Sequence, residues 1–188
     1  MPKVLVKKDQ NKLITVLMDG SSAGLAMTEE RIDVILAGEN ASVEVVGLVL
    51  GKNSDEKSLE AYITHAAPRT KSKVIVRSVL RDRSTFAFRG NVKIEKGAKG
   101  SDAYLRSDAL LFDDAKMGDD TPALEILEPD VRAGHAATIG KVDEAMLFYL
   151  MSRGLSRNQA EKLLIEGFVS PIKNQLKKSK KGGLIWGQ

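Results

Sequence analysis

Cysteine is absent from all 188 residues of the chain. Without thiols, the chain can form no disulfide bond, has no thiolate nucleophile and offers no cysteine ligand to a metal. A metal site made by this chain alone would depend on histidine, aspartate and glutamate. Histidine occurs only twice, so such a site would have few nitrogen donors.

Long apolar runs are also missing. No stretch reaches the roughly 18 apolar residues of a membrane-spanning helix. The N-terminal sequence MPKVLVKKDQNK lacks the apolar segment of a signal peptide. We therefore expect a cytoplasmic protein that does not enter the membrane.

Charge of one sign is not concentrated on a face of the chain. The 29 basic and 25 acidic residues give a formal net charge of +4, and several of the basic ones lie in the C-terminal segment KNQLKKSKKGG. Nucleic acid is therefore disfavoured as a partner. A hydrophobic content of 43% indicates a chain that folds.

The chain up to Val131 is rich in short runs typical of strands, and several alternate apolar and polar residues with a period of two. The runs are 12–18, 31–37, 41–50, 58–65, 73–80, 84–90, 91–97 and 123–131. Most gaps between them are shorter than the dozen or so residues of a crossover helix, which disfavours a doubly wound α/β fold.

Two all-β folds remain. An antiparallel sandwich needs tight hairpin turns, and only Asp19-Gly20 fits one. A β-solenoid, with coils of about 20 residues, fits the spacing better. Its corners are expected at the glycines, which tolerate positive φ: Gly38, Gly51, Gly90, Gly97 and Gly100.

From Asp143 onward the apolar residues follow a helical period. Asp143 is expected to cap a helix over EAMLFYLMSR that ends at Gly154, with Met146, Tyr149 and Met151 in its core. A capping box of Ser156 and Gln159 predicts a second helix that ends at Gly167. Pro171 at a first helical position predicts a third. We divide the chain into a solenoid (1–140), a helical segment (141–178) and a flexible basic tail (179–188).

Several ordered motifs resemble the core region of the SufB/SufD family, scaffold proteins of SUF iron-sulfur cluster assembly. They are FRG at 88–90, the stretch 97–104, Leu110-Leu111, PALEI at 122–126, HAAT at 135–138 and the stretch 148–154. The resemblance implies an all-β core with a helical appendage, a right-handed parallel β-helix followed by a small C-terminal helical segment. It also implies pairing through the β-helix and docking of a SufC-like ABC-type ATPase through the helices.

Two departures from the family pattern bear on function. Full-length family members carry a further N-terminal region, whereas this sequence begins almost directly with strands. The second departure is Ala133, which stands where many relatives have a cysteine. Because SufB-type proteins need a cysteine for cluster building, the chain resembles SufD more than SufB. We expect a homodimer or a pair with a SufB-like protein. We expect no cofactor held by the chain itself, although an iron-sulfur cluster shared at a subunit interface is compatible with the family.

The resemblance also selects the site residues. His135 is the candidate cluster or metal residue, against the alternative of a structural histidine bonded to a loop carbonyl. His65 is interpreted as structural. The expected docking residues are Phe148, Tyr149, Arg153, Leu163, Leu164 and Phe168.

Two classes of function remain. The first is a non-catalytic scaffold or interaction subunit of the SUF system. The second is a β-helical carbohydrate-active enzyme that uses the carboxylates of Asp113, Asp114, Asp119 and Asp120. With one Trp, three Tyr and no export signal, the chain has few of the aromatics that stack on sugars, so the scaffold is favoured over an enzyme.

Overall fold

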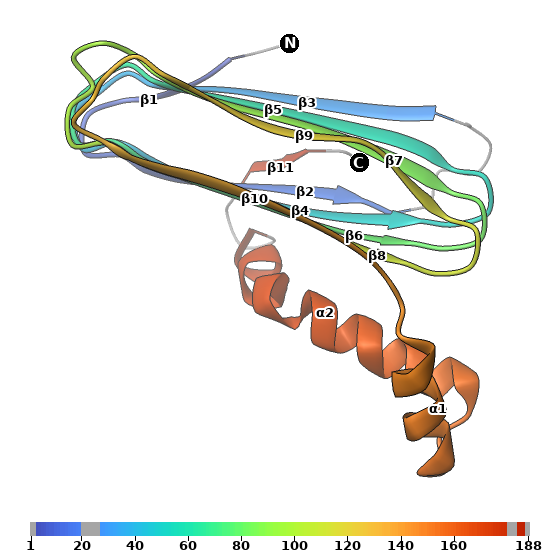
Figure 1. The fold of residues 1–188 in the computed structure, drawn as a ribbon. Coiled ribbons are helices and arrows are strands. Elements are labelled where there is room, and N and C mark those ends of the chain that lie inside the picture. Colours follow the sequence, from blue (N-terminus) through green and yellow to red (C-terminus); the bar gives the residue numbers. More distant parts are fainter. Residues whose placement is uncertain (1–2, 20–26, 180–183, 187–188) are drawn as a thin grey trace.

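The structure is a computed structural model, and it describes residues 3–19, 27–179 and 184–186. Nearly all of this part is strand, followed by two helices (Figure 1). The strands are β1 (Val4–Val6), β2 (Asn11–Met18), β3 (Met27–Leu36), β4 (Ser42–Gly51), β5 (Glu56–His65), β6 (Lys71–Leu80), β7 (Thr85–Ile94), β8 (Asp102–Leu111), β9 (Lys116–Ile126), β10 (Arg132–Lys141) and β11 (Leu184–Trp186). The helices are α1 (Glu144–Ser152) and α2 (Arg157–Ser179).

Successive strands alternate between two sheets, which confirms a parallel β-solenoid of about four turns. Sheet A has the order β1-β3-β5-β7-β9, and sheet B has the order β10-β8-β6-β4-β2-β11. Every pairing between strands in the described part is parallel. Each coil is longer than the expected length of about 20 residues. One coil leads from Asn11 to its partner Ser42 in the next strand of sheet B, and the following coil leads from Ser42 to Lys71. Each such coil holds one strand of each sheet and two turns.

The apolar core lies between the two sheets, because alternate side chains of each strand point inward. In β6, Val74, Val76 and Leu80 are fully buried. Stacked positions of neighbouring coils share one environment, as Leu59 and Phe88 do in sheet A.

The corners are built mainly from asparagine and aspartate, and only in part from glycine. Asp9, Asn40, Asn53, Asp82 and Asp113 all have positive φ, a conformation that Asn and Asp adopt more readily than most residues. Their side chains stack from coil to coil: Asn40 Nδ2 donates to Asp9 Oδ1 at 2.8 Å, and the Asp82 amide donates to Asp113 Oδ2 at 3.1 Å.

The prediction of a corner at Gly90 is wrong. This glycine lies inside β7, where a Cβ atom would come within 2.5 Å of Leu105 Cδ1. A side chain is excluded there by core packing, and the two predicted runs 84–90 and 91–97 merge into one strand. Gly38, Gly97 and Gly100 do lie in turns, and Gly51 ends β4.

The helix caps are as expected. Asp143 accepts hydrogen bonds from the amides of Ala145 and Met146, and Gly154 follows α1 with φ of +95°. Ser156 and Gln159 exchange the two hydrogen bonds of a capping box. The prediction that a helix ends at Gly167 and a third begins at Pro171 is wrong, because α2 continues through both residues.

Helix α2 continues because one of its faces is held against the solenoid. Ile172 is buried with Val46 and Leu48 on the outer face of sheet B, and Val169 and Leu176 pack beside them. This contact provides apolar burial that stabilises the helix beyond what its own sequence supports. Figure 1 shows α2 running beneath sheet B and α1 projecting beyond it.

Two described elements include residues of the predicted tail. Leu184–Trp186 form β11, which pairs with β2, and Ser179 ends α2. The remaining tail residues, 180–183 and 187–188, lie outside the described residues, as does Gly20 of the Asp19-Gly20 turn. Within the described part, no helix is both long and apolar enough to cross a membrane.

Candidate functional site

His135 lies on β10, the last strand of sheet B, and is exposed. In the register of β10 and β8 it faces Leu105, which is fully buried in the core. Partners in a parallel ladder point to the same side of the sheet, so His135 points toward the interior of the solenoid. It is nevertheless exposed, because among the described strands no further coil follows β10. No described residue forms a hydrogen bond with its ring, so the alternative of a histidine bonded to a loop carbonyl finds no support in this part of the chain.

We call this region the open end: the inward-facing residues of β9 and β10. Both strands lie at the edge of their sheets. Ile126 and Ile139 are 45% and 51% exposed, although their partners one coil earlier, Ile94 and Ala109, are buried. The open end therefore presents core-type side chains together with two strand edges that pair with no other described strand.

Asp120 also points inward at the open end, which no pattern in the sequence predicts. A bulge in β9 shifts the register between Phe86 and Phe88, so that Asp120 is paired with the buried Phe88. Bulges re-aim side chains in this way. Burial raises the pKa of Asp120 above its ordinary value. The Ser107 hydroxyl offsets part of the rise, although its contact with the carboxylate does not reach hydrogen-bond geometry.

The carboxylates of the proposed carbohydrate site do not come together. Asp113 and Asp114 lie in the turn after β8, where Asp113 accepts a hydrogen bond from the backbone amide of Asp82. Asp119 points outward and pairs with Arg89 at 3.0 Å, whereas Asp120 points inward. Among residues 3–19, 27–179 and 184–186, no group of three or more histidine and acidic side chains is arranged to hold a metal.

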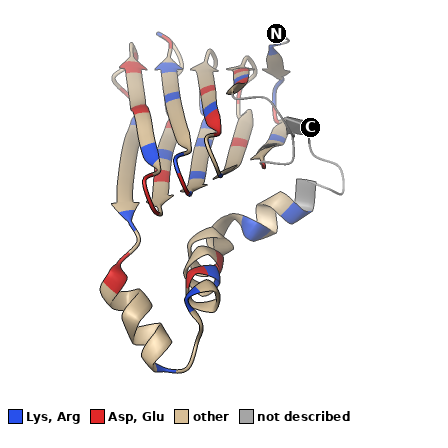
Figure 2. Ribbon diagram, turned by 90° about the vertical axis from the view of Figure 1, so that its right-hand side faces the viewer, with Lys and Arg blue, Asp and Glu red and all other residues tan. Residues whose placement is uncertain are grey.

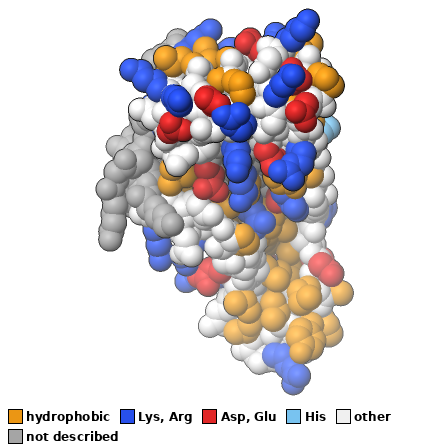
Figure 3. Space-filling view, turned by 90° about the vertical axis from the view of Figure 1, so that its left-hand side faces the viewer, with side chains coloured by type: hydrophobic (Ala, Val, Ile, Leu, Met, Phe, Trp, Pro, Cys, Tyr) orange, Lys and Arg blue, Asp and Glu red, His pale blue; other side chains and the backbone are white. Residues whose placement is uncertain are grey.

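The second surface is formed by the two helices, and its aromatic residues are largely uncovered. Phe148 is 74% exposed, Tyr149 53% and Leu163 49%. Met146 and Met151 are 45% and 41% exposed, so the expectation that they form a helix core with Tyr149 is wrong. We call these five residues the helical surface. Figure 3 shows hydrophobic side chains gathered over the helices, below the charged outer surface of the solenoid.

Helix α1 is short, and the residues between its first and last are apolar or aromatic. Among its nine residues only Leu147 is buried, and its sequence carries a charge only at Glu144. Arg153 follows the helix and lies over the ring of Tyr149, 5.5 Å from its centroid. Figure 2 shows the ribbon of α1 uncharged between its two ends. A helix with so little buried area has an apolar face available to a partner.

Two of the predicted docking residues have a different environment. Phe168 is half-buried against the solenoid: Arg77 lies over its ring at 5.0 Å and donates a hydrogen bond to its carbonyl oxygen. Leu164 is half-buried as well. Both residues are therefore less available to a partner than Phe148 and Leu163.

His65 has a structural role, as expected. It is fully buried at the end of β5, with Nδ1 at 2.8 Å from Thr70 Oγ1 and Nε2 at 2.8 Å from Ser72 Oγ. Burial lowers its pKa to about 4, and the charge of Asp102 offsets part of this fall. The imidazole is therefore neutral and joins β5 to the following turn and strand.

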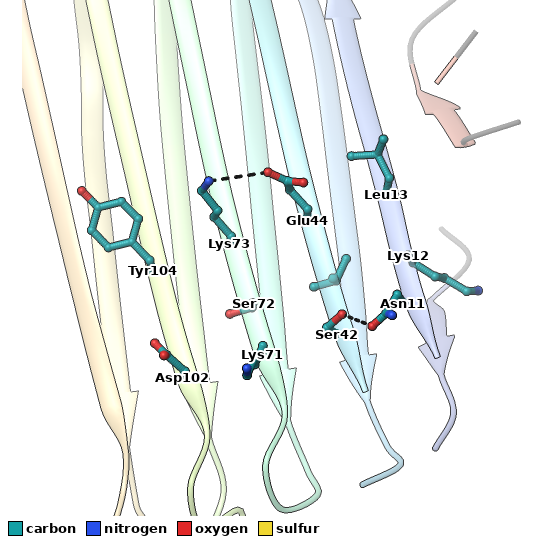
Figure 4. A pocket seen from close by; sticks show the side chains of 11 residues that line it. Asn11, Lys12, Leu13, Ser42, Glu44, Lys71, Ser72, Lys73, Asp102 and Tyr104 are labelled. Carbon is teal, nitrogen blue, oxygen red and sulfur yellow. Dashed lines mark hydrogen bonds and ion pairs between the residues drawn. The ribbon is translucent and has the colours of Figure 1, made fainter. Parts of the chain in front are cut away.

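A shallow depression of about 680 Å³ crosses the outer face of sheet B (Figure 4). Its charged side chains are of both signs, and Lys73 pairs with Glu44 at 3.7 Å. Asn11 accepts a hydrogen bond from Ser42 within it. With its charges largely balanced internally, the depression has no chemistry that selects one ligand.

Comparison with known proteins identifies the family of the chain. Residues 14–168 match the model of the SUF system FeS cluster assembly, SufBD core domain. The chain belongs to the SufB/SufD family. The match contains the whole run from β3 to β10 and α1, and it continues through Phe168 of α2.

Curated relatives agree with this family. The chain is 38% identical over 159 residues to an iron-sulfur cluster assembly SufBD family protein of Mycobacterium tuberculosis, which covers 85% of the chain and 19% of the relative. It is 36% identical over 141 residues to the iron-sulfur cluster assembly protein SufD of Bacillus subtilis, covering 75% and 32%. With SufB of the same organism it shares 31% over 159 residues, covering 85% and 34%. The chain thus spans about a fifth to a third of the length of these relatives.

The donor atoms of this SufB/SufD family member do not suit an iron-sulfur cluster held by one chain. Clusters are normally held by thiolates, and the chain has none. The open end offers one imidazole and the buried carboxylate of Asp120, which are ligands for harder divalent ions.

Proposed function

We propose that this chain is a SufD-like, non-catalytic scaffold subunit of an iron-sulfur cluster assembly system in the cytoplasm. It pairs with a second subunit through the open end and docks a SufC-like ABC-type ATPase through the helical surface. The observation that carries the proposal is the uncovered last coil, where core-type side chains and strand edges are left without a partner among the described residues of the family's own core domain.

The pairing proposal rests on two properties of the open end. Ile126 and Ile139 occupy inward positions whose partners one coil earlier are buried, so covering them is favourable by about 25 cal/mol per Å² of apolar surface. The edges of β9 and β10 also offer unpaired backbone groups, which bind another strand readily. A second copy has the same surface and can form a symmetric pair, and a SufB-like subunit is the other candidate.

Mass measurement of the purified chain tests pairing. We expect a dimer for the chain alone, or a one-to-one complex when a SufB-like protein of the same host is added. A chain that stays monomeric at micromolar concentration in both cases contradicts the proposal. If the pair forms with a SufB-like protein, an iron-sulfur cluster at its interface would take His135 from this chain and cysteines from that protein, whereas a homodimer has no cysteine to hold one.

The docking proposal rests on the exposure of the helical surface. Burying a Phe or Leu side chain contributes about 1.5–3 kcal/mol. Phe148 and Leu163 together can therefore supply a substantial share of a micromolar interaction, which needs about 8 kcal/mol. An apolar helix face is a common way to recognise a partner groove.

Replacing Phe148 with Asp tests docking without removing a core residue, since this side chain is 74% exposed. We expect binding of the ATPase to weaken by at least about tenfold, because one anchor is lost and a charge is introduced. Met27→Asp is the control: this residue is 59% exposed and lies on β3, away from the helices. Equal binding by the two variants would refute the docking role of α1.

A further inference from the structure

Helix α1 is held to the rest of the protein by few apolar contacts. Only Leu147 is buried, and the residue that leads into the helix, Asp143, is exposed. A free helix of nine residues is marginal in water, so α1 depends on its contacts with α2. The position of α1, which carries most of the helical surface, therefore depends on polar contacts as well.

A chain of four charged side chains provides such contacts. Arg81, which directly follows β6, pairs with Glu161 on α2, and Arg157 Nε donates to the same carboxylate at 2.9 Å. Arg157 also donates to both carboxylate oxygens of Glu144 on α1, at 3.0 and 3.3 Å. The chain therefore runs from the solenoid through α2 to α1.

The links of this chain are not equal. The Glu144 side chain is 68% exposed and that of Arg157 50% exposed, so their pair alone is a surface ion pair that stabilises little. The Glu161 side chain is only 7% exposed and lies between two guanidinium groups. A buried carboxylate between two cations is the link whose loss changes most, because Arg81 loses its ion-pair partner and Arg157 loses one of its two.

We infer that Glu161 is the positioning residue of the helical surface. It anchors the start of α2 to Arg81 of the solenoid, and it holds Arg157 in the orientation that binds Glu144 of α1. Glu161 itself is not part of the surface that meets a partner. This inference rests on the proposed docking function only for its effect on the ATPase, since the ordering of α1 is a property of the chain alone.

Glu161→Gln tests the inference, because it keeps the shape of the side chain and removes its charge. We expect the amides of α1 to exchange with solvent about tenfold faster or more, because α1 leaves its docked orientation more often. ATPase affinity should fall by the factor by which the ordered fraction of α1 decreases, since only that fraction is competent to bind. Amides of β5 and β7, which lie in the other sheet, should be unchanged.

The matched control is Glu166→Gln, which removes the same charge from an exposed position of the same helix. We expect it to behave as the original chain in both measurements. If exchange in α1 does not change in Glu161→Gln, Glu161 does not position α1 and the inference is wrong. If exchange rises equally in α1, β5 and β7, Glu161 stabilises the whole protein and the inference is wrong as well. Failure of the original chain to bind the ATPase would instead refute the docking proposal and leave the exchange measurement decisive for Glu161.

Discussion

Protonation of His65 should destabilise the protein at mildly acidic pH. The hydroxyl of Thr70 donates to the carbonyl of Ala67 at 3.0 Å, so it accepts from His65 Nδ1, and Nε2 is left to accept from Ser72. Both ring nitrogens are thus used by the neutral form. An added proton would place a positive charge in a fully buried site.

The size of the effect follows from the difference in pKa between the two states. The folded protein holds the pKa of His65 at about 4, whereas an unfolded chain has the ordinary value of about 6.5. The unfolded chain therefore binds more protons between these values, and stability falls as pH decreases through this window. Full protonation corresponds to about 3 kcal/mol, and the loss between about pH 7.5 and about pH 5 is about 2 kcal/mol.

Urea denaturation of the original chain and of His65→Gln, at several pH values, measures this loss. Glu30 and Asp120, whose pKa values burial raises, titrate in both proteins and cancel in the difference. We expect the free-energy advantage of the original chain to shrink by about 2 kcal/mol on acidification. His135→Gln, at the only other histidine and in an exposed position, is the matched control variant. A constant difference between the original chain and His65→Gln would refute the reasoning.

Three further predictions concern packing, pairing and metal content. Gly90→Ala should destabilise the protein by about 1–3 kcal/mol in urea denaturation, because its Cβ would overlap Leu105, whereas Gly140→Ala, with no atom within 4 Å of its Cβ, should cost far less. Ile139→Asp at the open end should weaken the pair by at least about tenfold in mass measurements, whereas Leu5→Asp on β1, of similar exposure, should not; equal effects would contradict pairing through the open end. Anaerobic reconstitution of the chain alone with iron and sulfide should give no stoichiometric cluster absorbance after desalting, and absorbance that persists and disappears in His135→Ala would contradict the ligand argument.

The solenoid could be predicted because the strand runs are short, alternate in polarity and leave no room for crossover helices. The hydrophobic pattern predicts a coil that is too short, because it does not reveal strands whose inward residues are small or polar. In β8 the inward positions include Ala103, Ser107 and Ala109, all of them buried, and this strand was not predicted. The same applies to β10, whose small residues resemble a connecting segment in the sequence.

The candidate sites follow from the sequence only in part. The family motifs select His135 and Phe148 as candidates, but the side on which a residue lies depends on register and packing. The bulge in β9 that turns Asp120 inward has no sequence signal of its own. The pairing of Arg81 with Glu161 joins residues 80 positions apart. Such contacts depend on how α2 lies on sheet B, and helix periodicity does not contain this information.

The two proposed surfaces are joined by a very short segment of chain. Lys141 ends β10 at the open end, and Asp143 caps α1, so that Val142 alone separates strand from cap. The amide of Val142 donates to the carbonyl of Leu111 at 2.9 Å, which fixes this segment to β8. A second connection runs through Glu161 and Arg81 to the end of β6. With the start of each helix tied to sheet B or to the residue that follows β6, a partner that binds α1 contacts an element attached to the sheet whose last strand carries His135. In the proposed function, these two connections hold a partner bound to α1 close to the open end.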